Sequence, residues 1–383
     1  MLKTTIYALI FAAALWHSEA LAQAKTVPIT GINPGFNLTE LNAVDALVLA
    51  WMHETGTPGL SIAFSRNGAL VLTRGYGYAD VGHREAVTPK HRFRVASISK
   101  SITAVAIAKL IEQKNLAWNS KVFGRYGMLG TRYGSQPNKP WQLALTVDHL
   151  LTHTSGAWTN KKNDPMFSYP YWSLTQLMNH TLDRASNTAQ PGIRYDYSNF
   201  GYALLGRIIE HRSGESYERF VRQQVLASMG IDDMVVGGNT LRDRRPHEVR
   251  YYPEQISYNM NVSRMEAHGG WVSSPRDLLK FMAHVDGKPG VPDQLHPALL
   301  KRMYTPWQEG ANYARGWQVN KRPNYWHRGS MPGTSSILVH THDGYAWAAL
   351  ANSRPHEDER GKLDRLMWDI KRAITFWPPV NLF

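Results

Sequence analysis

The sequence contains no cysteine among its 383 residues. This absence excludes disulfide bonds, thiolate nucleophiles and cysteine-ligated zinc together. A chain of this length can bury a large apolar core, so it does not need disulfides even outside the cytoplasm. Beyond the N-terminal segment, no uninterrupted apolar run reaches ~18 residues, the length that a membrane-spanning helix requires. The chain is therefore expected to fold around its own core, without cross-links.

Several sequence motifs are also missing. There is no Gly-x-Ser-x-Gly pattern, which argues against an α/β-hydrolase, and no phosphate-binding loop. We find no internal repeat and no low-complexity linker. Basic residues outnumber acidic ones by 43 to 30, giving a formal charge of +13, but they are scattered along the chain. A nucleic-acid-binding module would cluster them in a stripe. We therefore expect a charged, solvated surface and no nucleic-acid partner.

The N-terminus has the pattern of a secretory signal. Lys3 supplies the positive charge, residues 5–16 are apolar, and Ala22-Gln23-Ala24 forms a small-x-small cleavage site. We expect residues 1–24 to be a signal peptide and the mature protein to begin near Lys25, exported to the periplasm or secreted. No stable membrane span is then expected after cleavage. An uncleaved anchor is the alternative.

Hydrophobic periodicity divides the mature chain into a sheet made from both ends and a helical middle. A helix is predicted over 40–53, and a hairpin over 59–78 turns at Asn67-Gly68. Residues 97–302 have mainly helical patterns. Strands return near the C-terminus, and a last amphipathic helix closes the chain; these segments are 317–320, 325–328, 336–340, 346–351 and 362–374. The prediction is a single α+β domain over 25–383, with a sheet subdomain at about 40–95 and 310–383 and an inserted helical subdomain at about 96–309.

The first candidate catalytic pair is Ser97 and Lys100. They lie three residues apart at the start of a predicted helix, so their side chains share one face. The amine is then close enough to take the hydroxyl proton, and the unpaired N–H groups of the first turn favour developing negative charge. A Ser-x-x-Lys pair is one way to build a nucleophilic serine. The same spacing also occurs on ordinary solvated helix faces.

A second candidate site precedes another predicted helix, which is expected to open at Gly201 or Tyr202. Tyr197 could carry a proton if a nearby cation lowered its pKa of about 10. In extended chain, Asn199 would point to the same side and could donate to a substrate carbonyl. The alternative is that Ser198 or Asn199 caps the helix while Tyr197 packs in the core.

The third candidate site is a predicted strand that ends in His327-Arg328-Gly329. Gly329 would allow the backbone to approach a ligand closely. The N–H of Ser330 could then join the N–H of Ser97 in an oxyanion hole. The alternative is a strand end with an exposed basic pair.

Two further features have open interpretations. His149 and His153 have the i, i+4 spacing of helical zinc ligands, but Leu150 stands where a general-base glutamate would follow the first histidine. Hydrogen bonding at a helix end or in the core is the default for both histidines, and no metal or organic cofactor is expected. Residues 158–171, with two prolines and several aromatic residues, could form a lid, a rim or a long surface loop.

Together, in this order, the three candidate sites resemble the penicillin-recognising serine hydrolases. That family includes class C β-lactamases, D-Ala-D-Ala carboxypeptidases, D-aminopeptidases and related esterases. The resemblance covers about residues 40–380. The segments that carry it are Phe93 to Ser101 (FRVASISKS), Tyr197-Ser198-Asn199, His327-Arg328-Gly329, Leu150 to Gly156 (LLTHTSG) and His268 to Met282 (HGGWVSSPRDLLKFM). It implies the β-lactamase/transpeptidase fold.

The resemblance also implies roles for the residues. Ser97 would be the nucleophile, Lys100 its base or proton-shuttle partner, and Tyr197 a second proton carrier. Asn199, His327, Arg328 and Gly329 would bind substrate, and the backbone N–H groups of Ser97 and Ser330 would form the oxyanion hole. A lysine packed away from water has a lowered pKa, which agrees with a role as base. The residues alone leave open whether Lys100 or Tyr197 removes the proton.

One departure from the family pattern bears on the substrate. The third motif is His-Arg-Gly, whereas most β-lactamases have Lys-Thr-Gly. His327 would be mostly neutral at pH 7, and Arg328 replaces the hydroxyl that would bind a β-lactam carboxylate. Arg328 could bind a substrate carboxylate bidentately or point into solvent.

We therefore expect an exported serine hydrolase that acts on a small molecule or peptide, with a peptidase or amidase ranked first. An esterase or acyltransferase and a class C-like β-lactamase are alternatives. A non-catalytic penicillin- or peptidoglycan-binding sensor is the further alternative.

Overall fold

The computed structural model describes residues 27–161, 163–354 and 359–383. The predicted signal peptide, residues 1–24, lies outside the described residues. Within these ranges, no helix has both the length and the apolar character that crossing a bilayer requires.

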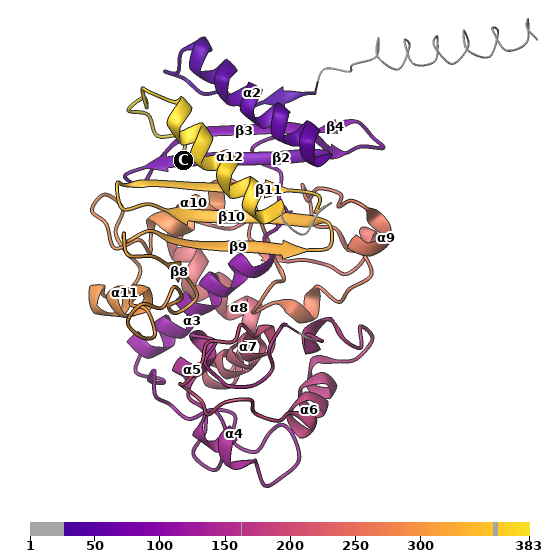
Figure 1. The fold of residues 1–383 in the computed structure, drawn as a ribbon, viewed down its shortest axis with the longest axis vertical. Helices are drawn as coiled ribbons and strands as arrows, with labels where there is room; N and C mark the ends of the chain where they lie inside the picture. Colours follow the sequence, from indigo (N-terminus) through magenta and orange to yellow (C-terminus); the bar gives the residue numbers. More distant parts are fainter. Residues whose placement is uncertain (1–26, 162, 355–358) are drawn as a thin grey trace, which may run out of the picture.

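The main sheet is antiparallel and joins the two ends of the chain, as predicted (Figure 1). Its strand order is β1-β3-β2-β11-β10-β9-β8, and the short β4 pairs with β3. Strands from the N-terminal and C-terminal segments meet where β2 pairs with β11. The bounds are β1 Ile29–Thr30, β2 Gly59–Arg66, β3 Ala69–Asp80, β4 Glu85–Ala86, β8 Gln318–Val319, β9 Tyr325–Met331, β10 Thr334–His340 and β11 Tyr345–Ala351. The fold class is therefore α+β, as the sequence indicated.

Turn residues fix the register of the sheet. Asn67 and Gly68, between β2 and β3, have φ values of 49° and 80°, the left-handed pair that a type I′ turn needs. Gly344, between β10 and β11, has a φ of 83°. The alternation of side chains then sends Ile62 and Phe64 to one face of the sheet and Ala63 to the other.

Helices cover both faces of the sheet. On one face lie α2, Leu38–Thr55, and the C-terminal α12, Glu359–Ala373 (Figure 1). Their apolar stripes pack on strand residues such as Phe64 and Trp347 in one continuous core. The other face is covered by α10, Pro275–Ala283, which Ser274 caps by accepting a hydrogen bond from the N–H of Asp277. Thus α10 belongs to the sheet layer, although it lies inside the predicted 96–309 helical subdomain.

The remaining helices lie below the sheet in Figure 1, except for the short α9, which lies beside β9 and β10. They are α3 Ser99–Glu112, α4 Pro140–Ala144, α5 Val147–Leu151, α6 Leu174–Arg184, α7 Asn199–Ser213, α8 Tyr217–Val221, α9 Glu254–Ser257 and α11 Pro297–Tyr304. A small second sheet has the order β5-β7-β6, with bounds β5 Phe93–Arg94, β6 Val235–Val236 and β7 Trp271–Ser273. The helical stretch over 217–229 consists of α8 followed by π and 3-10 turns.

Candidate active site

The turn that carries Ser97 joins the two halves of the molecule. Ser97 lies in a 3-10 turn, Ala96–Ile98, that continues directly into α3, so the predicted first helical turn is wound more tightly than expected. Ala96 is buried with a φ of 48°, a left-handed conformation that costs a non-glycine residue roughly 1–3 kcal/mol. Val95 holds this turn: its N–H donates to Trp271 O at 2.9 Å, and its carbonyl accepts from Ser336 Oγ at 2.8 Å. The surrounding structure therefore imposes the position of Ser97.

The Lys100 amine is fully buried and faces three oxygen atoms. Its Nζ lies 3.1 Å from Ser97 Oγ, 2.6 Å from Asn199 Oδ1 and 2.7 Å from the carbonyl oxygen of His268. Burial holds the pKa of Lys100 well below its usual value, against a smaller opposing effect of Asp164. The Asn199 and His268 oxygens can only accept, so they take both N–H groups of a neutral amine. The remaining lone pair of Nζ is then left for the hydroxyl proton of Ser97.

Tyr197 and Asn199 flank the same serine. Asn199 is the first residue of α7, capped by Ser198, whose Oγ accepts from the N–H of Gly201 at 3.1 Å. The expected opening at Gly201 or Tyr202 was therefore wrong, and so was the extended conformation assumed for Asn199. Tyr197 bonds to Ser97, but burial outweighs this hydrogen bond and raises the pKa of the phenol well above its usual value. The Lys100 Nζ lies 4.8 Å from the centre of the Tyr197 ring. Tyr197 is therefore a protonated phenol at neutral pH.

His327 belongs to a chain of buried hydrogen bonds with Tyr313 and His153. The backbone N–H of Ser198 donates to His153 Nδ1 at 3.1 Å, so a neutral His153 carries its proton on Nε2. That nitrogen lies 3.2 Å from the hydroxyl of Tyr313, which in turn lies 3.1 Å from His327 Nε2. The Nδ1 of His327 lies 2.7 Å from the carbonyl of Arg328 and donates to it. Burial lowers the pKa of His153 well below its usual value and that of His327 to about 3, so both rings stay neutral.

Arg328 and Gly329 have partners within the chain. The guanidinium of Arg328 lies 2.7 Å from Asp364 on α12, an ion pair that neither sequence interpretation of Arg328 anticipated. A Cβ at Gly329 would collide with Ser336 Oγ and the carbonyl of Val95. Gly329 therefore permits a close approach to the turn that carries Ser97, and its approach to a ligand stays a prediction. Ser330 lines the same cavity as Ser97.

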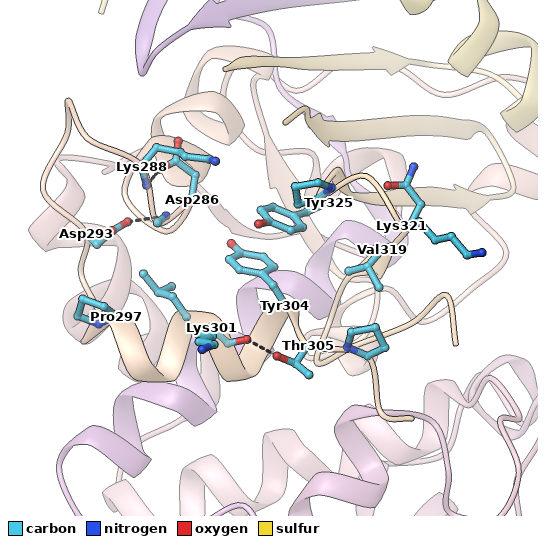
Figure 2. Close-up of a pocket in the computed structure, with 15 residues that line it drawn as sticks. Asp286, Lys288, Asp293, Pro297, Lys301, Tyr304, Thr305, Val319, Lys321 and Tyr325 are labelled. Atoms are coloured by element: carbon cyan, nitrogen blue, oxygen red, sulfur yellow. Dashed lines mark hydrogen bonds between the residues drawn. The ribbon is translucent and has the colours of Figure 1, made fainter. Parts of the chain in front are cut away.

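These residues surround a cavity of about 800 Å³. Its lining includes Ser97, Tyr197, Asn199, His327, Arg328 and Ser330. The structure thus brings every predicted site residue to one place, with Lys100 directly beneath Ser97 and Gly329 supporting its turn. A second cavity of about 420 Å³ lies beside α11, where the rings of Tyr304 and Tyr325 stack 3.9 Å apart (Figure 2). The lining of this second cavity includes neither Ser97 nor Lys100.

Sequence reasoning did not assign four members of this site. Tyr313 and the carbonyl of His268 are contacts that only the folded chain creates. Asp164 and Asn160, from the loop at 158–171, also line the cavity, so this loop forms a rim. Some signals were available, since His268 and His153 lie in segments that carried the family resemblance, and the loop at 158–171 was a candidate rim.

Both histidines of the i, i+4 pair have hydrogen-bond partners within the chain. His149 accepts from the N–H of Thr146 at 3.3 Å at the start of α5, and His153 belongs to the chain of hydrogen bonds described above. In the described ranges, no group of three or more histidine or carboxylate side chains is placed to hold a metal ion. Core and helix-end hydrogen bonding therefore describes both histidines.

Comparison with known proteins agrees with this geometry. Residues 44–372 match the family model described as Beta-lactamase. The chain is 26% identical over 322 residues to protein flp of Staphylococcus aureus, covering 81% of this chain and 62% of that protein's length. It is 25% identical over 326 residues to the putative penicillin-binding protein PbpX of Bacillus subtilis, covering 84% and 76% of the two chains.

Among solved structures, the D-amino acid amidase of Ochrobactrum anthropi SV3, complexed with L-phenylalanine amide, is similar with a TM-score of 0.70. The two chains are 26% identical, and the match covers 87% of this chain and 99% of the amidase. The fold, the cavity and the sequence match lead to one conclusion: the chain belongs to the Beta-lactamase family and has the fold of its serine hydrolases.

Proposed function

We propose that this protein is an exported serine hydrolase that cleaves an amide or ester bond through an acyl group on Ser97, and that it is first of all an amidase or peptidase. The contacts of Lys100 carry the proposal. A buried amine whose two N–H groups are bound to carbonyl oxygens presents its lone pair to Ser97 Oγ, 3.1 Å away. This is the arrangement that a general base requires.

In the proposed reaction, Lys100 takes the hydroxyl proton as Ser97 Oγ forms a bond to the substrate carbonyl carbon. The backbone N–H groups of Ser97 and Ser330 would stabilise the negative charge on the carbonyl oxygen. The bond to the leaving group then breaks, and the leaving amine or alcohol receives a proton through Tyr197, which Lys100 reprotonates. Water then attacks the acyl carbonyl carbon and passes its proton through Tyr197 to Lys100. The bond to Ser97 Oγ breaks, and Lys100 returns the proton to Ser97. Lys100 rather than Tyr197 is proposed as base, because burial favours a neutral amine and a protonated phenol.

Two observations support an amidase or peptidase above the alternatives. The position that holds a lysine in most β-lactamases is occupied by His327, whose two ring nitrogens are both engaged and which stays neutral. The similar amidase structure was solved with an amino-acid amide. An esterase or acyltransferase remains the second choice and a β-lactamase the third.

The proposal of export rests on residues 1–24 of the sequence. N-terminal sequencing of the protein recovered from the periplasm or medium of a producing cell would test it. A new N-terminus near Lys25 is the expected result, and an intact N-terminus in a membrane fraction would instead indicate an anchor.

The activity is tested by intact-mass spectrometry with a fluorophosphonate, followed by turnover assays on amino-acid p-nitroanilides, p-nitrophenyl acetate and nitrocefin. We expect one label on the wild type, none on Ser97→Ala, and the highest kcat/KM on an anilide. Fast turnover of nitrocefin would overturn the ranking in favour of a β-lactamase. An unlabelled, folded wild type would contradict the enzyme itself and favour a protein that only binds.

A further inference from the structure

A carboxylate lies in the wall of the cavity, next to the residues that hold Ser97. Asp164 belongs to the 158–171 loop and lines the cavity together with Asn160 and the exposed ring of Phe167. Its Oδ2 accepts from Asn199 Nδ2 at 2.6 Å, and its Oδ1 accepts from the N–H of Met166 at 3.0 Å. The Asn199 amide therefore connects Asp164 to Lys100. Only the side chain of Asn199 lies between Asp164 and the proposed base, Lys100.

The loop that carries Asp164 is fixed in place. The guanidinium of Arg264 donates four hydrogen bonds to loop carbonyls, at distances between 2.8 and 3.1 Å; the acceptors belong to Met166, Ser168, Tyr169 and Trp172. Asn261 donates a further bond to the carbonyl of Pro170 at 3.0 Å. A carboxylate on a loop held by so many contacts is a preorganised part of the cavity wall.

Among the described residues, Asp164 has hydrogen-bond donors but no ion-pair partner. Across the described ranges, no arginine, lysine or histidine side chain forms an ion pair with its carboxylate. The nearby Lys100 bonds to Asn199 instead, and Arg328 is paired with Asp364. A carboxylate has about four lone-pair positions, and the two protein donors use two of them. A partly buried carboxylate is most stable with an opposite charge close to it.

We propose that Asp164 binds a positively charged amino group of the substrate, so that the preferred substrates are amides or short peptides with a free ammonium group beside the scissile carbonyl. This inference rests on the proposed function and names its substrate class. With the scissile carbonyl carbon at Ser97 Oγ, the nitrogen of an α-ammonium group lies two bonds away on the acyl side. Asn199 and Asp164 form the wall next to Ser97 and Lys100, and the substrate side chain faces Phe167.

The test compares three substrates that share one leaving group. They are phenylalanine p-nitroanilide, as each enantiomer, its N-acetyl derivative, and 3-phenylpropionyl p-nitroanilide, which lacks the amino group. For the wild type, we expect kcat/KM for one enantiomer of the free amine to exceed that of the other two compounds by about tenfold or more. Equal or better turnover of the N-acetyl or amino-free compound would overturn the proposal without any variant.

Asp164→Asn separates charge from shape. Asparagine keeps an acceptor for the N–H of Met166 but removes the negative charge and the acceptor that Oδ2 offers to Asn199, so the preference for the free amine should fall to within about threefold. Comparing this preference, the ratio of kcat/KM values, between the variant and the wild type cancels any difference in intrinsic reactivity between the substrates. Asp183→Asn, an exposed position on α6 away from the cavity, is the matched control and should keep the wild-type ratio. A folded Asp164→Asn with an unchanged ratio would overturn the proposal.

Failure of this inference can be told apart from failure of the proposed function. Fluorophosphonate and p-nitrophenyl acetate carry no ammonium group, so they report on Ser97 alone. Labelling at Ser97 with no preference for free amines removes only the role of Asp164. Absence of labelling would contradict both the proposed hydrolase function and the role of Asp164. An equal loss of activity on all three substrates in Asp164→Asn would show that Asp164 only positions Asn199, and would also overturn the inference.

Discussion

The hydroxyl oxygen of Tyr313 lies 3.1 Å from Nε2 of His327. The same oxygen lies 3.2 Å from Nε2 of His153, whose proton it accepts. Tyr313 therefore donates its own proton to His327, and the Nδ1–H of His327 is directed to the carbonyl of Arg328. This fixes both tautomers and holds His327 neutral at the edge of the cavity. His327 consequently contributes shape and polarity rather than charge.

Tyr313→Phe should weaken both catalysis and folding. It leaves the Nε2–H of His153 buried without an acceptor, which costs about 1–3 kcal/mol of unfolding free energy. It also frees the His327 ring to reorient, and we expect kcat/KM to fall by about tenfold, which is ~1.4 kcal/mol. Chemical denaturation and steady-state kinetics measure the two effects. Tyr304→Phe removes a buried hydroxyl at the second cavity and should affect stability alone (Figure 2). Equal kinetic effects of the two variants would contradict this role of Tyr313.

Lys100→Met should abolish rapid acylation while the protein stays folded. The variant keeps an apolar chain of similar length in the buried site but removes the base, and general-base catalysis contributes roughly 10²–10⁴-fold. Fluorophosphonate labelling followed by intact mass gives the rate. Lys109→Met, on the same helix but bonded to Glu112 and to the carbonyl of Gln294, is the control. Labelling at the wild-type rate in Lys100→Met would assign the base elsewhere.

The acylation rate should rise with pH through one ionisation that belongs to Lys100. Burial lowers the pKa of this amine, so the neutral, active form is populated below the usual lysine value of about 10.4 and is lost as pH falls through the shifted pKa. No step is expected near pH 6.5 from His327, whose pKa is about 3. Pre-steady-state bursts with p-nitrophenyl acetate between pH 5 and 10 measure this. A rise centred near 10.4 would mean an unperturbed lysine, and the rise should be absent from Lys100→Met.

Gly329→Ala should separate strand β9 from the turn that carries Ser97. Its Cβ would overlap Ser336 Oγ and the carbonyl of Val95, and overpacking of this kind costs about 1–3 kcal/mol. We expect a lower thermal midpoint together with slower acylation, because the strand and the turn share the cavity. Gly82→Ala adds the same methyl group at an exposed position where the nearest atom is 3.4 Å away. A Gly329→Ala variant as active as Gly82→Ala would show that the strand position does not matter.

Much of the fold was readable from local pattern. The alternation in residues 59–78 and the Asn67-Gly68 turn each depend on residues close together in sequence, and each is confirmed. Helix starts were less accurate: α7 begins at Asn199 because Ser198 caps it, whereas the apolar pattern pointed to Gly201 or Tyr202. Where several polar residues precede a helix, only the backbone decides which one is the cap.

The sequence by itself determined the sheet built from both chain ends, the family resemblance, and the residue types at Ser97, Lys100, Tyr197 and Asn199. It did not determine their charge states. Those depend on contacts between distant segments. The carbonyl of His268 accepts from Lys100, and Tyr313 bonds to two histidines. Asp364 pairs with Arg328, and Asp164 accepts from Asn199. Proton affinity depends on burial and on neighbouring charges. Only the tertiary structure, which brings these groups together and excludes water, decided these contacts, on which the proposed roles of Lys100 and Asp164 rest.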